Sequence, residues 1–279
     1  MTIEDKLVTW NRIAWALHLV SAVTMSIVAT LPATENRREY MLTYQYTSWT
    51  DQGLVQENKN AYKLDLAWLI TSFSALSFVF QLIADPWIPF YDWKKRVEDG
   101  RPNPLRFIEY SISASLMLIC IALLSGIRNA MLVAALGLLT AACMLCGLVA
   151  EFLLWRSHTD EMIAQRPTYK SFAWAAHLTG WACMIGAYGT LWWSTGVTLS
   201  SASLRPPAWV WGIIISQMVL FMSFGAVQLA QFCYDYEGRR QREEPAIYTY
   251  AEFWYILLSL TAKFVLAWTI YASALMGDD

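Results

Sequence analysis

Charged residues are absent from long stretches of this sequence, and such stretches recur along its whole length. Uncharged runs cover residues 13–34, 66–84, 110–127, 129–150, 171–204 and 206–234, and residues 253–277 contain a single charge, Lys263. About 20 apolar residues in a helix cross the roughly 30 Å hydrocarbon core of a bilayer, where only a helix satisfies its own backbone. The pattern predicts seven transmembrane helices, over about 10–34, 65–86, 103–127, 129–155, 170–195, 206–235 and 249–276.

The composition favours one all-α membrane domain over the full 279 residues rather than a soluble enzyme. Hydrophobic residues make up 57% of the chain and charged residues 15%, whereas soluble domains average about 25% charged. Core helices of a soluble protein would be shorter and amphipathic. With 20 basic and 22 acidic residues the net charge is −2, so no basic surplus for nucleic acid exists. We expect a multi-pass protein of the cell membrane whose immediate surroundings are the lipid bilayer.

The cysteines do not indicate a metal site. Cys143 and Cys146 have CxxC spacing, but they lie in the middle of a predicted span without a second pair or a nearby histidine. We interpret them as small residues that pack between helices.

Lysines and arginines are distributed unevenly between the two ends of the predicted bundle. With Lys263 set aside, one end has 13 and the other has 6. The first set is Lys6, Arg12, Lys94, Lys95, Arg96, Arg101, Arg106, Arg156, Arg166, Lys170, Arg239, Arg240 and Arg242, and the second is Arg37, Arg38, Lys59, Lys63, Arg128 and Arg205. The positive-inside rule therefore predicts a cytoplasmic N-terminus and an external C-terminus.

The first external loop, about residues 35–65, is long enough to have structure of its own. Residues 41–50 are rich in Tyr, Thr and Trp, and Asp51-Gln52-Gly53 is typical of a turn. These features predict a β-hairpin, with an irregular loop as the alternative.

Lys263 lies about midway along the last predicted span. An ammonium group at that depth costs about 2.5–3.5 kcal/mol on insertion scales, so it should face the bundle and find a partner. A buried lysine is also a usable amine nucleophile that condenses with an aldehyde to a Schiff base. The sequence leaves open whether Lys263 has a covalent role or only pairs with a carboxylate.

Glu109, near the start of the third span, is the candidate partner. A carboxylate at this position would neutralise a protonated amine or imine on the last span. The alternative is a salt bridge at the rim with Arg106, one helical turn earlier. Ser111, Ser113 and Ser115 follow on the same helix, and serine is also a common packing residue in membranes.

At these residues the chain resembles a heliorhodopsin, a retinal protein of the microbial-rhodopsin superfamily. The resemblance covers essentially the whole chain and is strongest in five blocks of sequence. They are NRIA at 11–14 with His18, RFIEYS at 106–111, residues 147–151, GIIIS at 212–216 with Ser223, Phe224 and Gln228, and LSLTAK at 258–263 with LAW at 266–268. The inverted orientation predicted from charge is also that of this family.

The resemblance implies a role for each matching residue. Retinal, all-trans in the dark, would be bound covalently to Lys263 as a protonated Schiff base with Glu109 as its single counterion. Ser259, one turn before Lys263, would lie beside the Schiff base, where pumping relatives usually have a second carboxylate. The pocket would further include Ser111, Ser113, Ser115, Tyr110, Trp174 and Gln228.

A proton network is a further expectation from the resemblance. His18 would lie near a polar cavity on the cytoplasmic side, and Gln81 stands where the family often has a second histidine. Gln cannot accept a proton, which puts a two-histidine cluster in doubt. Arg106, Glu151 and His177 complete the candidate network, with a rim charge near Arg156 as the alternative for Glu151 and an ordinary buried hydrogen bond for the histidines.

The sequence favours a light sensor over a pump. The proton donor of pumping relatives lies eleven residues after the counterion, which here is Cys120, and Ser259 replaces the second carboxylate. The alternative is a light-gated passive proton conductor, with Glu109, Glu151, His177 and Asp235 lining its route. No HExxH or GxSxG motif indicates an enzyme. A homodimer and a cytoplasmic signalling partner, which the sequence does not identify, are further expectations, the dimer with Gly180, Gly186 and Ala187 permitting close helix contact.

Overall fold

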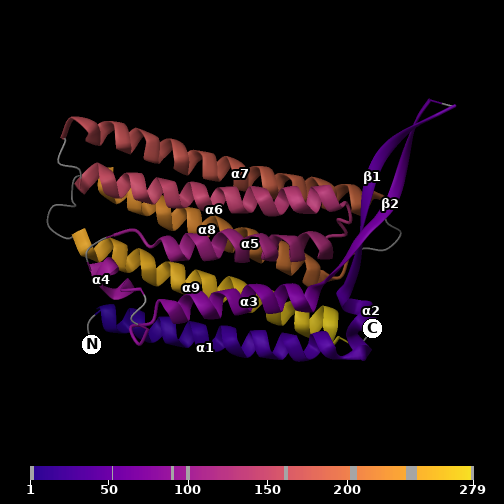
Figure 1. Cartoon of the computed structure of the whole chain (residues 1–279), viewed down its shortest axis with the longest axis horizontal. Helices are drawn as coiled ribbons and strands as arrows, with labels where there is room; N and C mark the ends of the chain where they lie inside the picture. Colours follow the sequence, from indigo (N-terminus) through magenta and orange to yellow (C-terminus); the bar gives the residue numbers. More distant parts are fainter. Residues whose placement is uncertain are drawn as a thin grey trace.

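Long helices lying side by side form the body of the protein, and a two-stranded hairpin projects from one end (Figure 1). The computed structural model describes residues 3–51, 53–88, 91–98, 101–159, 163–201, 206–236 and 244–277. The long helices are α1 (Ile3–Thr30), α3 (Leu66–Ile83), α5 (Pro104–Leu124), α6 (Ala130–Thr159), α7 (Arg166–Ser201), α8 (Ala208–Tyr236) and α9 (Glu244–Ile270). Short elements are η1 (Pro32–Thr34), α2 (Glu35–Arg38), α4 (Trp93–Glu98), η2 (Ile163–Gln165) and the π-helical turn η4 (Tyr271–Leu275).

Six of these helices are long and apolar enough to cross a membrane. Within the described residues, they are α1, α3, α5, α6, α8 and α9. The helix α7 lies along α6 but is not among the six, and its sequence carries many Gly, Ser and Thr residues, which lower hydropathy without adding charge. The prediction of a helical membrane protein is therefore confirmed for six spans.

The predicted hairpin is confirmed. Strand β1 (Glu39–Thr50) pairs antiparallel with β2 (Gly53–Asp65), from Glu39 opposite Asp65 to Thr50 opposite Gly53. Gly53 has φ +99°, a left-handed conformation that glycine adopts without a steric cost. The hairpin and the N-terminus lie at opposite ends of the bundle (Figure 1).

Specific side chains fix where the helices start. The Asp65 carboxylate accepts hydrogen bonds from the backbone N–H groups of Ala67 and Trp68 at 2.8 and 3.2 Å and so caps α3. Asn129 caps α6 in the same way through the N–H of Leu132 at 3.0 Å. These caps satisfy backbone donors that have no partner inside a helix.

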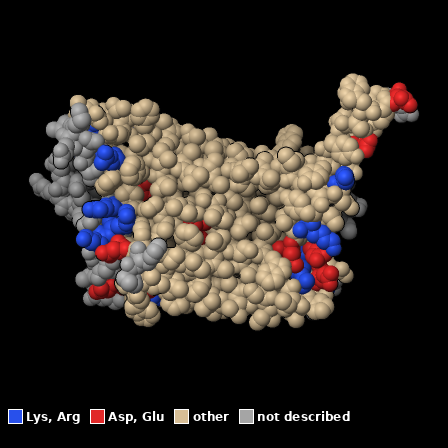
Figure 2. Space-filling model, viewed as in Figure 1, with Lys and Arg blue, Asp and Glu red and all other residues tan. Residues whose placement is uncertain are grey.

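Uncharged side chains cover most of the middle of the bundle, and most of the visible charges gather toward its two ends (Figure 2). Large residues such as Trp193, Leu138 and Met131 are 77%, 71% and 66% exposed, as lipid-facing residues would be. Inside, the largest apolar cluster runs through α3, α5, α6, α8 and α9 and includes Met117, Leu118 and Ile121.

Candidate functional site

The centre of the bundle contains a buried lysine–glutamate pair. Lys263 Nζ on α9 lies 2.5 Å from Glu109 Oε1 on α5 and 3.0 Å from Ser259 Oγ, one turn earlier on its own helix. Both charged residues are only 3% exposed. Glu109 therefore pairs with Lys263 and not with Arg106, so the alternative of a rim salt bridge is wrong.

A serine that the sequence analysis missed completes this pair. Ser77 Oγ on α3 lies 2.7 Å from Glu109 Oε1 and 2.9 Å from the Phe73 carbonyl oxygen, so its one proton serves one acceptor at a time. Lys263 Nζ also lies 4.9 Å from the centroid of the Tyr110 ring. Two charges in an apolar interior are retained only with close, hydrogen-bonded partners, which this arrangement supplies.

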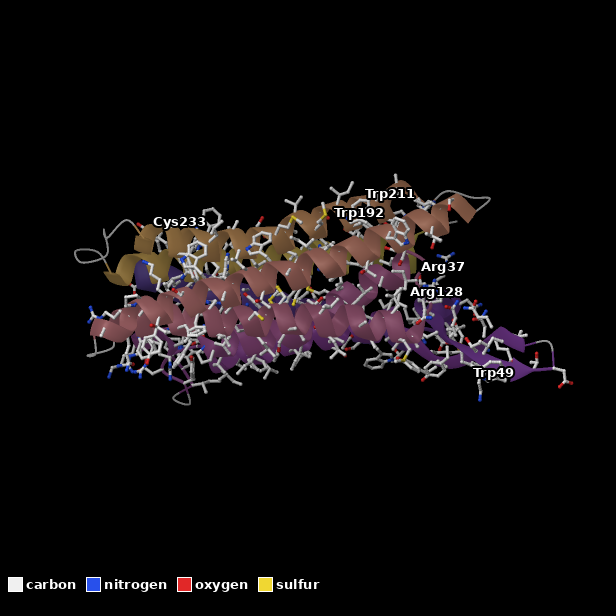
Figure 3. The ribbon with its side chains drawn as sticks, turned by 90° about the horizontal axis from the view of Figure 1, so that it is seen from above. Arg37, Trp49, Arg128, Trp192, Trp211 and Cys233 are labelled. Atoms are coloured by element: carbon white, nitrogen blue, oxygen red, sulfur yellow. The ribbon has the colours of Figure 1, made fainter. Side chains whose placement is uncertain are left out.

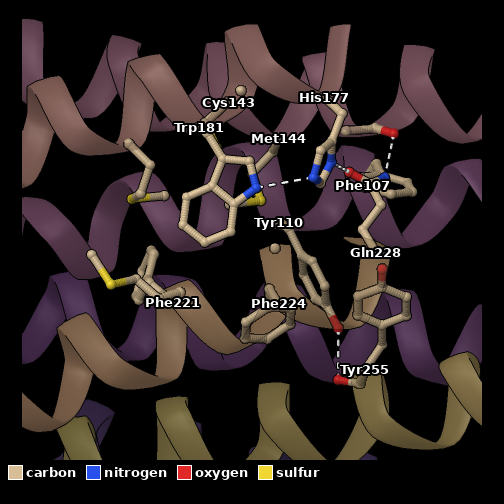
Figure 4. Close-up of a pocket in the computed structure, with 15 residues that line it drawn as sticks. Phe107, Tyr110, Cys143, Met144, His177, Trp181, Phe221, Phe224, Gln228 and Tyr255 are labelled. Carbon is tan, nitrogen blue, oxygen red and sulfur yellow. Dashed lines mark hydrogen bonds between the residues drawn. The ribbon is translucent and has the colours of Figure 1, made fainter. Parts of the chain in front are cut away.

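The apolar space near Lys263 has two parts, which are neighbouring pockets among α5, α6, α7, α8 and α9. One part is lined by Lys263, Ser259, Ser113 and Met117, and the next by His177, Trp181, Gly225 and Gln228. Residues common to the linings of both parts are Tyr110, Met144, Phe221 and Phe224. The two pockets thus lie between the Lys263 amine and the polar side chains of His177 and Gln228, and Figure 4 shows the second pocket with its aromatic walls.

Two glycines allow aromatic rings to close on this cavity. A Cβ atom at Gly225 would lie 2.6 Å from Trp181, and one at Gly147 would lie 2.7 Å from Phe107. Both distances are below any ordinary contact, so a larger residue at either position would displace a wall. An amine, a single carboxylate and a narrow aromatic cavity together fit a long polyene aldehyde such as retinal.

Hydrogen bonds at the far end of the cavity fix the tautomer of His177. Trp181 Nε1, which can only donate, lies 3.0 Å from His177 Nε2, so that nitrogen accepts. The Nδ1–H group then donates to Gln228 Oε1 at 2.9 Å, and Gln228 Nε2 donates to the Gly147 carbonyl at 2.8 Å (Figure 4). His177 is therefore neutral and fully engaged in a directed chain.

Arg106 lies in a second buried charged cluster. Its guanidinium bonds to Glu151 at 2.6 Å and to Glu252, and it covers the Tyr255 ring at 4.0 Å. Glu151 is 2% exposed, which contradicts the alternative of a rim charge. The sequence analysis did not single out Glu252, because this residue lies directly before the last predicted uncharged stretch, which begins at residue 253. Its spacing of eleven residues from Lys263, close to three helical turns, places both residues on one face of α9.

A small space of about 40 Å³ with a partly polar lining lies between α1, α3, α5 and α9. Its polar lining includes Asn11, Gln81, Arg106, Glu109 and Glu252. Asn11 Nδ2 donates to the Gln81 carbonyl at 2.9 Å. His18 is 1% exposed and does not line this space, and its Nε2 has no hydrogen-bond partner within the described residues.

The remaining predicted site residues lie in different places. Ser113 lines the cavity beside Lys263, but Ser111 bonds to the Ile108 carbonyl and Ser115 to the carbonyls of Ser111 and Gly137. Trp174 packs edge-on against Phe232, with ring centroids 4.9 Å apart, and is not part of the cavity lining. The structure therefore brings Lys263, Glu109, Ser259, Ser113 and Tyr110 together and leaves Ser111, Ser115 and Trp174 outside.

Solved structures and curated proteins were compared with this chain. A light-driven proton pump from Leptosphaeria maculans aligns with a TM-score of 0.50 at 12% identity, over 95% of this chain and 94% of the other. A thermophilic rhodopsin from Rubrobacter xylanophilus aligns with a TM-score of 0.46 at 15% identity, over 95% and 100%. The first likeness concerns the fold alone. No curated protein matches the sequence.

The family comparison is more decisive, because the profile of the heliorhodopsin family matches residues 7–275, nearly the whole chain. Membership implies a multi-pass membrane protein with a retinal chromophore bound through a Schiff base. The chain belongs to the heliorhodopsin family.

Proposed function

We propose that the protein is a light-sensing photoreceptor that holds all-trans retinal covalently on Lys263, with Glu109 as its single counterion. The observation that carries the proposal is the buried pair of Lys263 and Glu109, 2.5 Å apart, with Lys263 in the lining of an apolar pocket that also contains Tyr110, Phe221 and Phe224. When bound, retinal supplies a light-absorbing polyene whose linking nitrogen is positively charged.

The residues around this nitrogen would keep it protonated and would orient its N–H group. The Glu109 carboxylate balances the charge, because opposite charges at close range keep each other ionised in a low dielectric. Ser259 and Ser77 offer hydroxyl groups on either side of the pair, at 3.0 Å from Lys263 and 2.7 Å from Glu109. Met144, Phe221 and Phe224 would exclude water from the polyene.

Two observations favour signalling over pumping. Ser259, a neutral residue, takes the place beside Lys263 where pumping relatives usually have a carboxylate. Cys120, at the position of their proton donor, is fully buried in the apolar cluster. Within the described residues, every charged residue that is fully buried lies at the pair or between it and the N-terminal end: Asp85, Arg106, Glu109, Glu151, Glu252 and Lys263.

The same asymmetry disfavours the alternative of a passive proton conductor. A conductor needs exchangeable groups along its whole length, whereas the hairpin half is lined by residues such as Met117, Ile121 and Leu266. Light would instead rearrange protons and hydrogen bonds within one half, among Glu109, His18, Gln81 and the Arg106 cluster. His177 would lie beside the far end of the chromophore and would respond to its movement.

We also propose the arrangement in the membrane. The N-terminus would be cytoplasmic and the hairpin external. The helix α7 would also cross the membrane, which brings the number of spans to seven. A homodimer would use the outer face of α7, where Gly186, Gly189 and Gly196 have open space beside them, whereas Gly180 already packs on Cys143. The signalling partner would meet the cytoplasmic end, which the charged cluster approaches.

The test is a visible absorption spectrum of the protein expressed with all-trans retinal, beside Lys263→Ala. We expect a visible band in the wild type that hydroxylamine bleaches and that the variant lacks. A well-folded wild type without such a band would overturn the photoreceptor. Whole-cell photocurrents that reverse with voltage would instead identify a conductor, and their absence at several pH values supports a sensor.

A further inference from the structure

A large cleft opens at the hairpin end of the bundle, far from Lys263. It encloses about 820 Å³ between the base of the hairpin, the turn before α6, the start of α8 and the end of α9. Its lining includes Arg37, Tyr40, Arg128, Trp209 and Ala274. Figure 3 labels both arginines at this end of the molecule, beside the base of the hairpin.

Arg128 is held firmly, but it has no anionic partner among the residues that the structure describes. Its carbonyl accepts a hydrogen bond from Thr43 N at 2.8 Å, its Nη1 donates to the Leu123 carbonyl at 2.5 Å, and its guanidinium lies 4.3 Å from the Tyr40 ring centroid. Among the described residues, neither its Nε nor its Nη2 has a hydrogen-bond partner. The Nε and Nη2 donors of a guanidinium group that is held in place are therefore available for further hydrogen bonds.

Two carboxylates at the base of the hairpin, Glu39 in the cleft lining and Asp65, are paired with other cations. Glu39 pairs with Lys63 at 2.6 Å, and Asp65 pairs with Arg38 at 2.6 Å. Burial lowers the pKa of Arg128 from its ordinary value, as expected for a cation whose desolvation no carboxylate offsets. Arg37, which donates to the Gly277 carbonyl, also lines the cleft.

We propose that this cleft binds a small organic anion, a carboxylate or phosphate attached to an apolar body. The free side of the Arg128 fork matches the two oxygens of such a group. Trp209, Pro207 and Ala274 offer apolar surface beside it. Ala274 belongs to the π-helical turn at the end of α9, a distortion that frequently marks functional sites. The anion could come from a lipid headgroup or from solution.

Benzoate is the probe, and benzamide, its uncharged analogue of the same shape, is the control ligand. The full chain with retinal is placed in nanodiscs of phosphatidylcholine and titrated calorimetrically. We expect benzoate to bind and benzamide not to bind. Arg128→Gln should weaken benzoate binding about tenfold or more, because a charged hydrogen bond is lost. Lys59→Gln removes an exposed positive charge from the same hairpin and should have no effect.

A second variant keeps the proposal testable if Arg128→Gln loosens the end of α5. Ala274→Leu narrows the cleft at its apolar wall without removing a cation and should also weaken benzoate binding, while the visible band reports that each variant is folded. In nanodiscs of phosphatidylglycerol, loss of benzoate binding would identify the lipid headgroup as the natural anion, and unchanged binding would indicate a soluble one.

Three results would overturn the proposal. They are the absence of benzoate binding by the folded wild type, equal binding of benzamide, and unchanged affinity in Arg128→Gln. If benzoate binds only after removal of Asp278 and Asp279, which follow Gly277 and lie outside the described residues, the anion is the chain's own C-terminus and no external ligand is needed.

Discussion

Two lysine–glutamate pairs in this protein have almost the same length and very different surroundings. Lys263 and Glu109 are 2.5 Å apart in the centre of the bundle, and Lys63 and Glu39 are 2.6 Å apart at the base of the hairpin. The side chains of the first pair are 3% and 4% exposed, and those of the second are 58% and 27% exposed. The comparison teaches that burial, not contact geometry, distinguishes the two pairs.

Water explains the difference. In solvent, screening and side-chain entropy leave an exposed pair with little net stabilisation. In the apolar interior neither charge is tolerated alone, so the removal of one partner forces the other to change its state. The interior pair is thus linked to any reaction that changes its charge, and the exterior pair is not.

Removal of the buried carboxylate should have the largest effect on the chromophore. In Glu109→Gln the chromophore would lose its proposed counterion, so the pH at which the visible band disappears should fall by about 1–3 units. A spectrophotometric pH titration measures this directly. Ser111→Ala, whose hydroxyl bonds only to the Ile108 carbonyl, is the control, and an unchanged titration in Glu109→Gln would show that another group is the counterion.

The second buried cluster should respond almost as strongly. Arg106→Gln leaves Glu151 and Glu252 without their cation and should destabilise the protein by about 3–5 kcal/mol. The triple variant with Glu151→Gln and Glu252→Gln removes the uncompensated charges, and most of the stability should return. Thermal unfolding followed by loss of the visible band measures both, and a triple variant as unstable as the single one would indicate packing, not charge, as the cause.

Loss of the buried hydrogen bonds between the neutral side chains of Trp181, His177 and Gln228 should also lower the stability of the protein. His177→Phe leaves Trp181 Nε1 and Gln228 Oε1 without their partners, and each unsatisfied group costs about 1–3 kcal/mol. Trp181→Phe added to this variant removes one of the two orphaned groups, so the double variant should recover part of the loss in thermal unfolding. Additive losses would mean that the hydrogen bond from Trp181 to His177 contributes nothing.

Much of this contrast could be predicted from the sequence. The uncharged stretches locate the helices, Asp51-Gln52-Gly53 locates the hairpin, and Lys263 is a charge in a span where no charge is expected. The partners of Arg106 could not be predicted, because residues on different helices meet only after packing. Ser77 carries no signal at all, since a serine in a membrane helix usually bonds to its own backbone, as Ser72 and Ser115 do.

The exposed pair should show the smallest effect. Lys63→Gln should leave thermal unfolding unchanged within error at neutral pH, and 1 M salt should not alter the visible band of the wild type, because screening acts on exposed charges.

The hydrogen bond to Glu39 raises the pKa of Lys63 above its ordinary value. A raised pKa in the folded state means that any stability from this pair is complete below the unfolded pKa of about 10.4 and is lost as the pH rises through the folded value. Unfolding of wild type and Lys63→Gln compared between pH 7 and 11 measures this contribution. A large loss at neutral pH would show that the exposed pair, like the buried one, holds the structure together, and the contrast between the two pairs would fail.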